Sequence, residues 1–481
     1  MLYRKLIEEH LEDPRIVLYD ADGGMTFGQI HHAVSKYCLL FQKQGILRGD
    51  RILVTAAPSL KTVILILACI ASGVIFVPVS EDVDEMDRKY IVKDCTPKAL
   101  QDNADEYEMD DGRMAQRELC TEHTLAYIIY TSGSEGIPKG VVASQKQILF
   151  CSKTINERLC NTKKDKILCC LPMSFDYGLY QIFLSFFSGA VLILERGNII
   201  QRIPYLLNKW KITAFPTIPT VANLMVKAGM LNKAQTASLR YITFTGEVLS
   251  VALLEELAAL LPETRLVPMY GLTECKRVSV MPLDRADKIK AGSCGLPLEG
   301  VRVYLKQKDA VTGIGELAVA GDNVMEGYWN ARAGSDPVFS VDEKTGERVV
   351  CTGDLFRIDE DGFLYFCGRK SDIIKIKGYR VSGMGIESKL KKIKEIREIA
   401  VIGVPDSVTG ENLAIFVYTC QDEIVREEIN LQMRKGLPCL QNYELYMFKE
   451  PLPRNKNGKI DRNKLKRTSR GNEIFGCSKG K

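Results

Sequence analysis

The first 260 residues alternate short, β-branched apolar runs with segments whose apolar residues recur at helical spacing. The runs include RILVTA, VIFVPV, LAYIIYT, DKILCCLPM, AVLIL, ITAFPT and LRYITFT, and PYLLNKW and VANLMVKAGML are examples of the segments between them. Apolar strands separated by helices are typical of buried, largely parallel sheets. We therefore expect an α/β fold whose large N-terminal domain consists of layered α/β subdomains.

The pattern changes after Gly300. The stretches VRVYL, GELAVAG, RVVCTG and GFLYFCG are short and bounded by turns, as in a small β-rich subdomain. After GRKSD, strands and helices resume on a smaller scale in IIKIKGY, ESKLKKIKEI and LAIFVYT. This predicts a large domain over residues 1–368, a hinge at 369–372, a small α+β domain over 373–466 and a flexible basic tail over 467–481.

One stretch, TVILILACIASGVIFVPV at residues 62–79, has the length of a membrane span. Ser72-Gly73 interrupts it, and its second half is rich in Val and Phe and ends near Pro78. The pattern therefore predicts a buried helix followed by a buried strand, with no membrane span. The start, MLYRKLIEEHLEDPR, is charged and amphipathic, so we expect no signal peptide.

Composition adds two constraints to this 481-residue chain. The net charge of +5 is too small to indicate a nucleic-acid partner. The charge is distributed unevenly, because the residues from Lys370 onward include 23 Lys and Arg but 14 Asp and Glu, a net charge of +9, which leaves −4 for the rest of the chain. Such a basic segment is either a solvated surface or a domain that meets phosphates or an acidic partner. Fifteen cysteines without a C-x-x-C pair favour a reducing cytoplasm over disulfides or a zinc site.

A polar loop follows one apolar run in YIIYTSGSEGIPKGVV, residues 127–142. Glycines, hydroxyls and a lysine suit a loop that holds an anion such as phosphate. The Walker spacing fails, because the second glycine it requires falls on Pro138 and Lys139 is followed by Gly140. Taken alone, the loop is either a phosphate-binding loop or a solvent turn.

Four further stretches decide between these possibilities: MYGLTE, CTGDLFRIDEDGFLYFCGRKSD, IKIKGYRVS and LPRNKNGKIDRNKL. Together with YTSGSEGIPKG, in this order, they resemble the signature set of the adenylate-forming superfamily of acyl-CoA synthetases, nonribosomal-peptide adenylation domains and luciferases. The resemblance spans the whole chain. It implies that ATP and Mg²⁺ are used to join a carboxylic acid to AMP, and that the small C-terminal domain is a mobile lid.

The resemblance also implies roles for individual residues. Residues of the glycine-rich loop would grip the β- and γ-phosphates, Tyr270 would stack on adenine, Thr273 would bond the α-phosphate, Asp354 would hold the ribose and Arg369 the sugar or a phosphate. Lys459 would be catalytic together with Thr273 and Glu274, and Mg²⁺ would bind Glu274 and Thr131. The full ATP and AMP set is Thr131, Ser132, Gly133, Ser134, Gly136, Lys139, Gly246, Glu247, Tyr270, Gly271, Thr273, Asp354 and Arg369.

In such enzymes the lid turns at a hinge, here Ser371 and Asp372, and a second arrangement opens a path for a thiol, here past Lys377, Gly378 and Tyr379. The chain departs from the family at three positions. Glu135 stands where Thr is commoner, Ser371 where Asp or Lys is usual, and Gly383 where Pro is usual. These departures leave open which residue turns.

The acid is indicated by LPMSFDYGLYQ, residues 171–181, and we place the pocket at Phe175, Asp176 and Tyr177. In amino-acid-activating relatives a Phe-Asp pair begins the pocket and its Asp pairs with the substrate ammonium, whereas in fatty-acid-activating relatives the equivalent Asp is structural. Both interpretations stay open. The chain resembles stand-alone bacterial ligases, and no carrier domain follows Lys481, so the acceptor would be separate: CoA or the phosphopantetheine of a carrier protein.

The sequence gives less support to three other functions. A regulator that binds nucleotide without chemistry is disfavoured by the intact Lys459, Glu274 and Asp354. A kinase-like phosphotransferase is disfavoured by the failed Walker spacing. Luciferase-type oxidation after adenylation is compatible with the sequence but nothing in it favours this step.

Overall fold

The computed structural model describes residues 1–101, 120–132, 138–197, 200–232, 236–285, 292–331, 338–342, 345–376, 379–406, 410–436, 443–454, 460–469 and 477–480. Contacts divide the chain into two compact units. The first comprises Met1–Tyr304, Ala318–Thr352 and Ile358–Tyr365, and the second Leu305–Leu317, Gly353–Arg357 and Phe366–Lys481. The hinge predicted at 369–372 remains a prediction.

A nine-stranded sheet, in the order β14-β13-β12-β11-β10-β8-β9-β1-β2, forms the centre of the first unit. Its strands are β1 (Ile16–Tyr19), β2 (Gly24–Thr26), β8 (Lys166–Cys169), β9 (Val191–Leu194), β10 (Ala214–Thr217), β11 (Tyr241–Phe244), β12 (Arg265–Tyr270), β13 (Ser279–Val280) and β14 (Leu296–Pro297). The run from β1 to β12 pairs in parallel, and β2, β13 and β14 are antiparallel edges. The predicted parallel α/β layer is confirmed.

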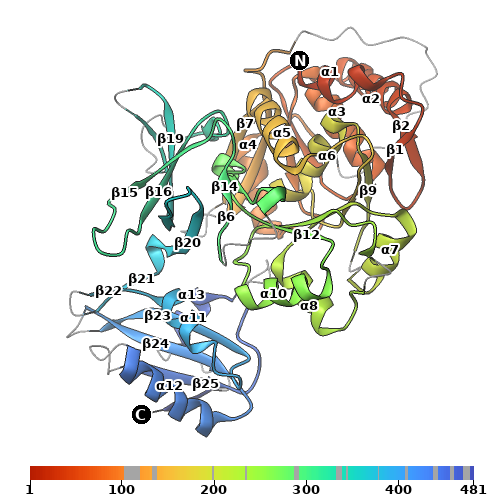
Figure 1. The fold of residues 1–481 in the computed structure, drawn as a ribbon. Helices are drawn as coiled ribbons and strands as arrows, with labels where there is room; N and C mark the ends of the chain where they lie inside the picture. Colours follow the sequence, from red (N-terminus) through yellow and green to blue (C-terminus); the bar gives the residue numbers. More distant parts are fainter. Residues whose placement is uncertain are drawn as a thin grey trace. The chain divides into compact units, whose positions relative to one another are not determined.

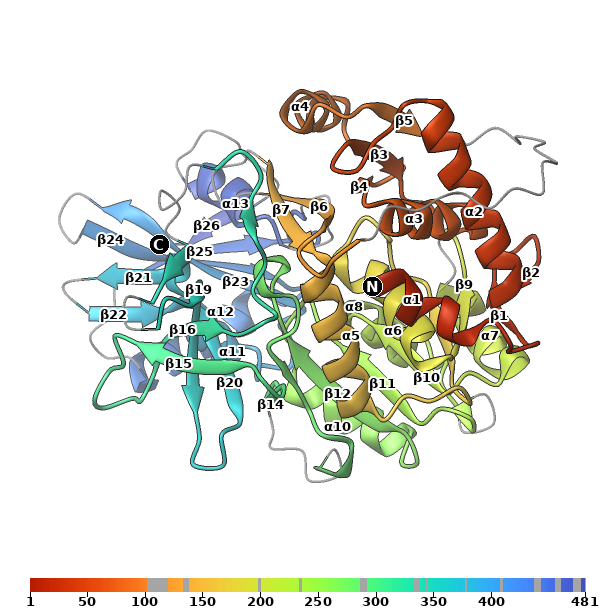
Figure 2. The same ribbon diagram turned by 90° about the horizontal axis from the view of Figure 1, so that it is seen from above.

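Helices cover both faces of this sheet. On one face, buried leucines of α7 (Ile203–Trp210) and α10 (Val251–Leu260), with Ala222 and Met225 of α8 (Pro219–Lys227), pack on strand residues such as Phe215. On the other lie α5 (Gln145–Leu159) and α6 (Asp176–Ser188), which run side by side (Figures 1 and 2). The short elements α1 (Leu2–Leu6) and η1 (Glu8–His10) precede β1, and η2 (Ile200–Arg202) precedes α7.

A six-stranded sheet, in the order β17-β7-β6-β4-β3-β5, forms the second layer of this unit. It contains β3 (Arg51–Thr55), β4 (Ile75–Val79), β5 (Ala99–Gln101), β6 (Leu125–Ser132), β7 (Pro138–Ser144) and β17 (Gly327–Tyr328). Helix α4 (Glu85–Cys95) contributes Ile91 and Cys95 to its core, and α2 (Phe27–Lys43) packs on α3 (Leu60–Ser72).

The apolar stretch at residues 62–79 folds as the sequence predicts. It forms most of α3 and all of β4, separated by Gly73, which adopts φ 69° as the helix C-cap. Ten of the thirteen α3 residues are buried, which explains why the helix is apolar on all sides. Within the part of the chain that the structure describes, no helix is long and apolar enough to cross a membrane.

Strands also dominate the predicted β-rich region. A five-stranded sheet has the order β15-β16-β19-β18, with β20 beside β19. Its strands are β15 (Arg302–Lys306), β16 (Gly315–Ala320), β18 (Phe339–Val341), β19 (Arg348–Ile358) and β20 (Leu364–Arg369). Outside this sheet the chain also forms three short 3-10 turns, η3 (Thr273–Cys275), η4 (Leu283–Arg285) and η5 (Lys370–Asp372). Strands β15, β16, β19 and β20 contribute residues to both units.

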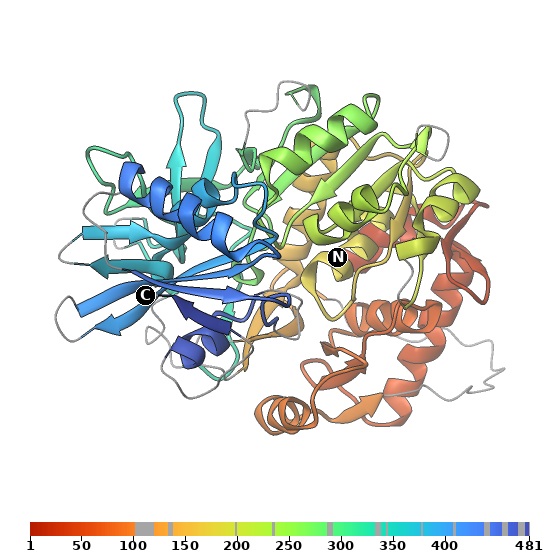
Figure 3. The same cartoon turned by 90° about the horizontal axis from the view of Figure 1, so that it is seen from below.

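The second unit contains a six-stranded sheet in the order β22-β21-β24-β25-β26, with β23 beside β24. Its elements are β21 (Ile373–Ile376), β22 (Tyr379–Ser382), α11 (Gly383–Leu390), β23 (Glu398–Asp406), β24 (Gly410–Tyr418), α12 (Asp422–Gly436), β25 (Tyr443–Phe448), α13 (Arg462–Ser469) and β26 (Cys477–Gly480). Alternate residues of β23 and β24 bury against α11 and α12 on one face and α13 on the other, and α12 crosses the strands in Figure 3.

Candidate active site

The glycine-rich loop is carried by a hairpin of the six-stranded sheet. Strands β6 and β7 pair antiparallel, with Thr131 opposite Lys139, and the Thr131 hydroxyl donates to the Lys139 carbonyl at 3.5 Å. Ser132 ends β6. Gly133, Ser134 and Gly136 lie outside the described residues. The residues on either side of the loop are therefore paired with each other across the hairpin.

A tight turn follows Tyr270, which ends β12 and is half-buried. A Cβ on Gly271 would lie 1.9 Å from the carbonyl oxygen of Lys276, so only glycine fits at this position. The chain then makes the single 3-10 turn η3, which carries Thr273 and Glu274. Both side chains therefore follow the carboxyl end of β12, the last strand of the parallel run, and this is the edge where open α/β sheets bind ligands.

Tyr328 connects this turn to the hairpin. Its backbone pairs with β7, its hydroxyl donates to Glu274 Oε1 at 2.7 Å, and Lys139 Nζ lies 5.0 Å from the centre of its ring. The Met325 backbone N–H also donates to the Glu274 carbonyl at 3.0 Å. Lys139 and Glu274, which the sequence places in the ATP and metal site, thus contact the same side chain. The sequence did not single out Tyr328, because its contacts join segments far apart in the chain.

Gly246 and Glu247 follow β11. Gly246 has φ 86°, a left-handed conformation that suits glycine. Glu247 accepts from both the backbone N–H of Thr220, at 3.1 Å, and its hydroxyl, at 2.6 Å, in the first turn of α8. A carboxylate stabilises such a helix start, so this contact gives Glu247 a structural task. Its expected part in nucleotide binding remains a prediction.

The predicted acid pocket begins at α6. A Cβ on Gly178 would lie 2.3 Å from the Pro172 carbonyl, so glycine is needed to hold the first turn of α6 against the preceding loop. Tyr177 is buried, and its hydroxyl lies 2.7 Å from the hydroxyl of Thr243. Phe175, in contrast, is 52% exposed. Of the three predicted pocket residues, Tyr177 lines a cavity, whereas Phe175 and Asp176 do not.

Asp176 has an internal partner, Lys276, two residues beyond Glu274. Lys276 Nζ donates to Asp176 Oδ2 at 3.0 Å and to the Asp176 carbonyl at 2.9 Å, and it lies 4.1 Å from the centre of the Tyr180 ring. Its side chain is 1% exposed, and burial lowers the Lys276 pKa to about 8, although Asp176 opposes the shift. Its backbone has φ 46° and ψ −89°, a strained conformation.

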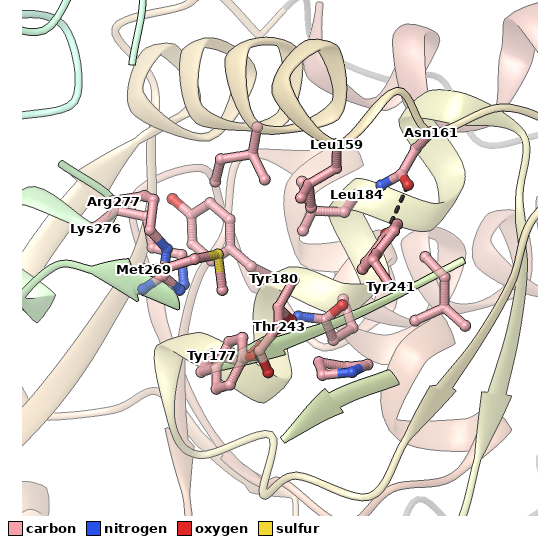
Figure 4. A pocket seen from close by; sticks show the side chains of 14 residues that line it. Leu159, Asn161, Tyr177, Tyr180, Leu184, Tyr241, Thr243, Met269, Lys276 and Arg277 are labelled. Carbon is pink, nitrogen blue, oxygen red and sulfur yellow. Dashed lines mark hydrogen bonds between the residues drawn. The ribbon is translucent and has the colours of Figure 1, made fainter. Parts of the chain in front are cut away.

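The cavity lies between α5, α6 and the sheet (Figure 4). Its interior amounts to about 10 Å³, about the room that one water molecule needs. Lys276, Arg277 and Met269 gather at one end and Asn161 and Tyr241 at the other. In the sequence, Lys276 and Arg277 follow the MYGLTE motif after one residue, Cys275, but two adjacent cations are ordinarily solvated.

Arg277 is 3% exposed. One terminal nitrogen donates to Thr245 Oγ1 at 2.7 Å, and the guanidinium lies 5.3 Å from the centre of the Tyr177 ring. Its Nε has no hydrogen-bond partner among the described residues. A buried donor without a partner is costly, so Nε requires an acceptor in the cavity, either a water molecule or an oxygen of a ligand.

The remaining predicted residues lie in the second unit. Asp354 is 3% exposed, and Arg369 Nε lies 3.2 Å from its Oδ1, so the predicted ribose residues are brought together. The hydroxyl of Ser371 donates to the carboxylate of Asp372 at 3.2 Å within η5. Tyr379 begins β22. Lys377 and Gly378 lie outside the described residues, so their place on the thiol path remains a prediction.

Lys459 also lies outside the described residues, but the segments on either side of it are held firmly. Arg454 and Ile460 form an antiparallel bridge, and the Asp461 N–H donates to the Pro453 carbonyl at 2.7 Å. Arg454 pairs with Glu398 at 2.7 Å.

On the other side of Lys459, Arg462 pairs with Glu387 at 2.7 Å and donates to the Val401 carbonyl at 2.9 Å. Glu387 in turn accepts from the Val401 N–H at 2.7 Å. Two ion pairs therefore anchor the base of the segment that carries Lys459. The sequence singled out neither pair.

Comparison with known proteins places this site in a family. Residues 7–329 match the family model described as AMP-binding enzyme, and residues 385–459 match that of the AMP-binding enzyme C-terminal domain. The chain is 25% identical over 509 residues to L-proline--[L-prolyl-carrier protein] ligase of Pseudomonas fluorescens, covering 98% of this chain and 100% of the relative. It is 28% identical to 4-coumarate--CoA ligase 3 of Oryza sativa subsp. japonica, covering 70% of this chain and 62% of the relative.

Another relative is much longer. The chain is 26% identical to bacitracin synthase 2 of Bacillus licheniformis, with 95% of this chain but 18% of that protein covered. Among solved structures, ATP-bound MatB from Rhodopseudomonas palustris superposes with a TM-score of 0.85 at 24% identity, covering 97% of this chain and 98% of MatB.

The o-succinylbenzoate CoA synthetase MenE from Bacillus subtilis, in complex with OSB-AMP, superposes with a TM-score of 0.82 at 23% identity, covering 96% of this chain and 98% of MenE. At these identities the two structural matches support the fold alone. The family models, which together cover most of the chain, support more: the chain belongs to the AMP-binding enzyme family of adenylate-forming ligases.

Proposed function

We propose that this enzyme joins a carboxylic acid to AMP, with release of pyrophosphate from ATP, and then transfers the acyl group to a thiol. The observation that carries the proposal is the contact of Lys139 and Glu274 with one tyrosine, Tyr328. A cation from the glycine-rich hairpin and a carboxylate from the MYGLTE turn are thereby held beside each other. Such an arrangement suits a triphosphate whose charge is shared between an ammonium and a metal ion.

The donor set fits Mg²⁺. The carboxylate of Glu274 and the hydroxyl of Thr131 are hard oxygen ligands, and Mg²⁺ uses few protein ligands when phosphates supply the others. Within the described residues, no group of three or more His, Cys, Asp and Glu could hold a metal by itself. When bound, the ion would neutralise phosphate charge, and Tyr328 would keep Glu274 oriented toward it.

Adenylation needs a further positive charge where the carboxylate attacks the α-phosphorus. We assign this charge to Lys459, because an ammonium between the two groups stabilises the negative charge that develops in the transition state. The ion pairs Arg454–Glu398 and Arg462–Glu387 support the assignment, since they hold the ends of the segment in place. Tyr270, Asp354 and Arg369 would hold the adenosine.

The second step breaks the acyl–phosphate bond and forms a thioester, with AMP leaving. The relatives include a CoA ligase and a carrier-protein ligase, so either thiol is compatible with the family. The basic balance of the residues from Lys370 onward suits both acceptors, because both carry phosphate groups.

The test is exchange of labelled pyrophosphate into ATP in the presence of pooled amino, aryl and aliphatic acids. We expect acid-dependent exchange that Lys459→Ala lowers by at least about 100-fold, while thioester formation from supplied acyl-adenylate is spared. Lys456→Ala, in the same segment, is the control and should leave exchange within about threefold. Release of ADP would indicate a phosphotransferase, and equal loss of both steps in Lys459→Ala would refute the assigned role.

A further inference from the structure

The cavity described above carries more positive than negative charge. Among the described residues that line it, the charged ones are Lys276 and Arg277. Asp176 pairs with Lys276. The nearby buried Asp165 is paired with Arg240 at 2.8 Å. One buried cation, the guanidinium of Arg277, is therefore left without an anionic partner among the residues described at this site.

An isolated buried charge is strongly unfavourable, so a protein that keeps one normally supplies a counter-ion. The planar guanidinium presents its donors as a fork that fits a carboxylate in two parallel hydrogen bonds. In Arg277 the unpartnered Nε belongs to this fork.

We propose that Arg277 binds a second carboxylate on the substrate, so that the acid activated by this enzyme is a short dicarboxylic acid. This inference rests on the proposed function and names its substrate class. One carboxylate reacts with ATP, and an oxygen of the other takes the water-sized space beside Arg277 and balances its charge.

The rest of the cavity wall has its hydrogen bonds made within the protein. The hydroxyl of Tyr177 lies 2.7 Å from that of Thr243, and the Gln181 amide donates to the Tyr177 carbonyl at 2.9 Å. Aliphatic side chains such as Leu184 line the remainder. Among the described residues that line the cavity, the buried polar side-chain atom without a hydrogen-bond partner is therefore Arg277 Nε, and this is where a substrate group would be recognised.

The pairing of Asp176 argues against an α-amino acid. In the amino-acid alternative, Asp176 would bind the substrate ammonium. Here the Lys276 ammonium already holds that carboxylate, at 3.0 Å, and also bonds the Asp176 carbonyl. A substrate ammonium would have to displace Lys276 and would enter a cavity that already carries excess positive charge, which is electrostatically unfavourable.

The test compares acids of equal chain length in pyrophosphate exchange: α,ω-dicarboxylic acids, monocarboxylic acids and α-amino acids. For the wild type we expect kcat/KM for a short diacid to exceed that for the matched monoacid by about 100-fold or more, because the monoacid leaves Arg277 unpaired. In Arg277→Met this preference should fall below about tenfold, chiefly through loss of activity on the diacid, while KM for ATP is unchanged. Arg277→Lys, which keeps the charge without the fork, should lie between. Arg196→Met, on the surface, is the control.

The outcomes separate the inference from the function on which it rests. If no acid supports exchange, the proposed function fails. If monoacids or α-amino acids are preferred by the wild type, the function stands and this inference is refuted. An equal loss on every acid in Arg277→Met would also refute it, because Arg277 would then serve the reacting carboxylate or the fold. If Arg277→Met does not fold, the wild-type preference and Arg277→Lys still decide.

Discussion

Removing the charge of Asp176 should destabilise the first unit far more than removing that of Lys276. In Asp176→Asn the ammonium of Lys276, whose side chain is 1% exposed, stays buried beside Arg277 without a counter-charge. In Lys276→Met the remaining carboxylate is 16% exposed and lies in the first turn of α6, where the helix dipole favours it. The two residues of this ion pair should therefore differ in how much their removal lowers the free energy of unfolding.

The magnitude follows from these contacts. Breaking a buried pair from one side costs about 3–5 kcal/mol. We expect the lower end, about 3 kcal/mol, for Asp176→Asn, because the Asp176 carbonyl and the new amide oxygen still accept from Nζ. For Lys276→Met we expect about 1 kcal/mol or less, since removal of a desolvated charge offsets the lost hydrogen bonds and the contact with Tyr180. The double variant should resemble Lys276→Met.

Urea unfolding followed by tryptophan fluorescence is a suitable assay. Both tryptophans, Trp210 and Trp329, belong to the first unit, so the signal reports on this unit. Glu85→Gln is the control: the Glu85–Lys89 pair is about three-quarters exposed on both sides and should contribute about 0–1 kcal/mol. If Asp176→Asn matches this control, or if its cost persists in the double variant, a stranded ammonium is not the cause.

Two further predictions concern protonation and the Lys459 segment. The Lys276 pKa is about 8 in the folded chain against an ordinary value of 10.5, so between these pH values the unfolded chain binds more protons than the folded chain. The free energy of unfolding of the wild type, measured relative to Lys276→Met, should therefore rise with pH in this range by up to ~1.4 kcal/mol per pH unit. A difference that does not change with pH would contradict this prediction. Arg462→Ala removes the ion pair with Glu387 and should slow adenylation by about tenfold or more, while thioester formation from supplied acyl-adenylate is spared. The control Arg467→Ala changes an exposed residue of the same helix and should not slow adenylation. Equal effects of the two variants would show that the ion pair does not position Lys459.

Local sequence patterns predicted the layered fold because its main elements have unambiguous local signals. The break at Ser72-Gly73 separated α3 from β4 correctly, since glycine is favoured at a left-handed C-cap. The ordered motifs also pointed to the family. These features depend on neighbouring residues, so they can be read along the chain.

The environment of Asp176 could not be predicted in this way. Lys276 is buried because the chain turns back at Gly271, and its partner lies 100 residues earlier. Nothing local distinguishes this lysine from a solvated one. The contacts of Tyr328 are similar, since they depend on the pairing of β17 with β7. Side chains joined by long-range contacts therefore could not be predicted from the sequence, and these decide the specificity proposed above.

The burial of α3 and β4 has a consequence for biosynthesis. Strand β4 pairs with β6, which begins at Leu125, and the same sheet is completed by β17, at Gly327–Tyr328. At about 5–20 residues per second, the ribosome needs about 2–10 s after Val79 to deliver even the first of these partners. During that interval the nascent polypeptide exposes one of its most apolar segments, which makes it a natural substrate for ribosome-associated chaperones.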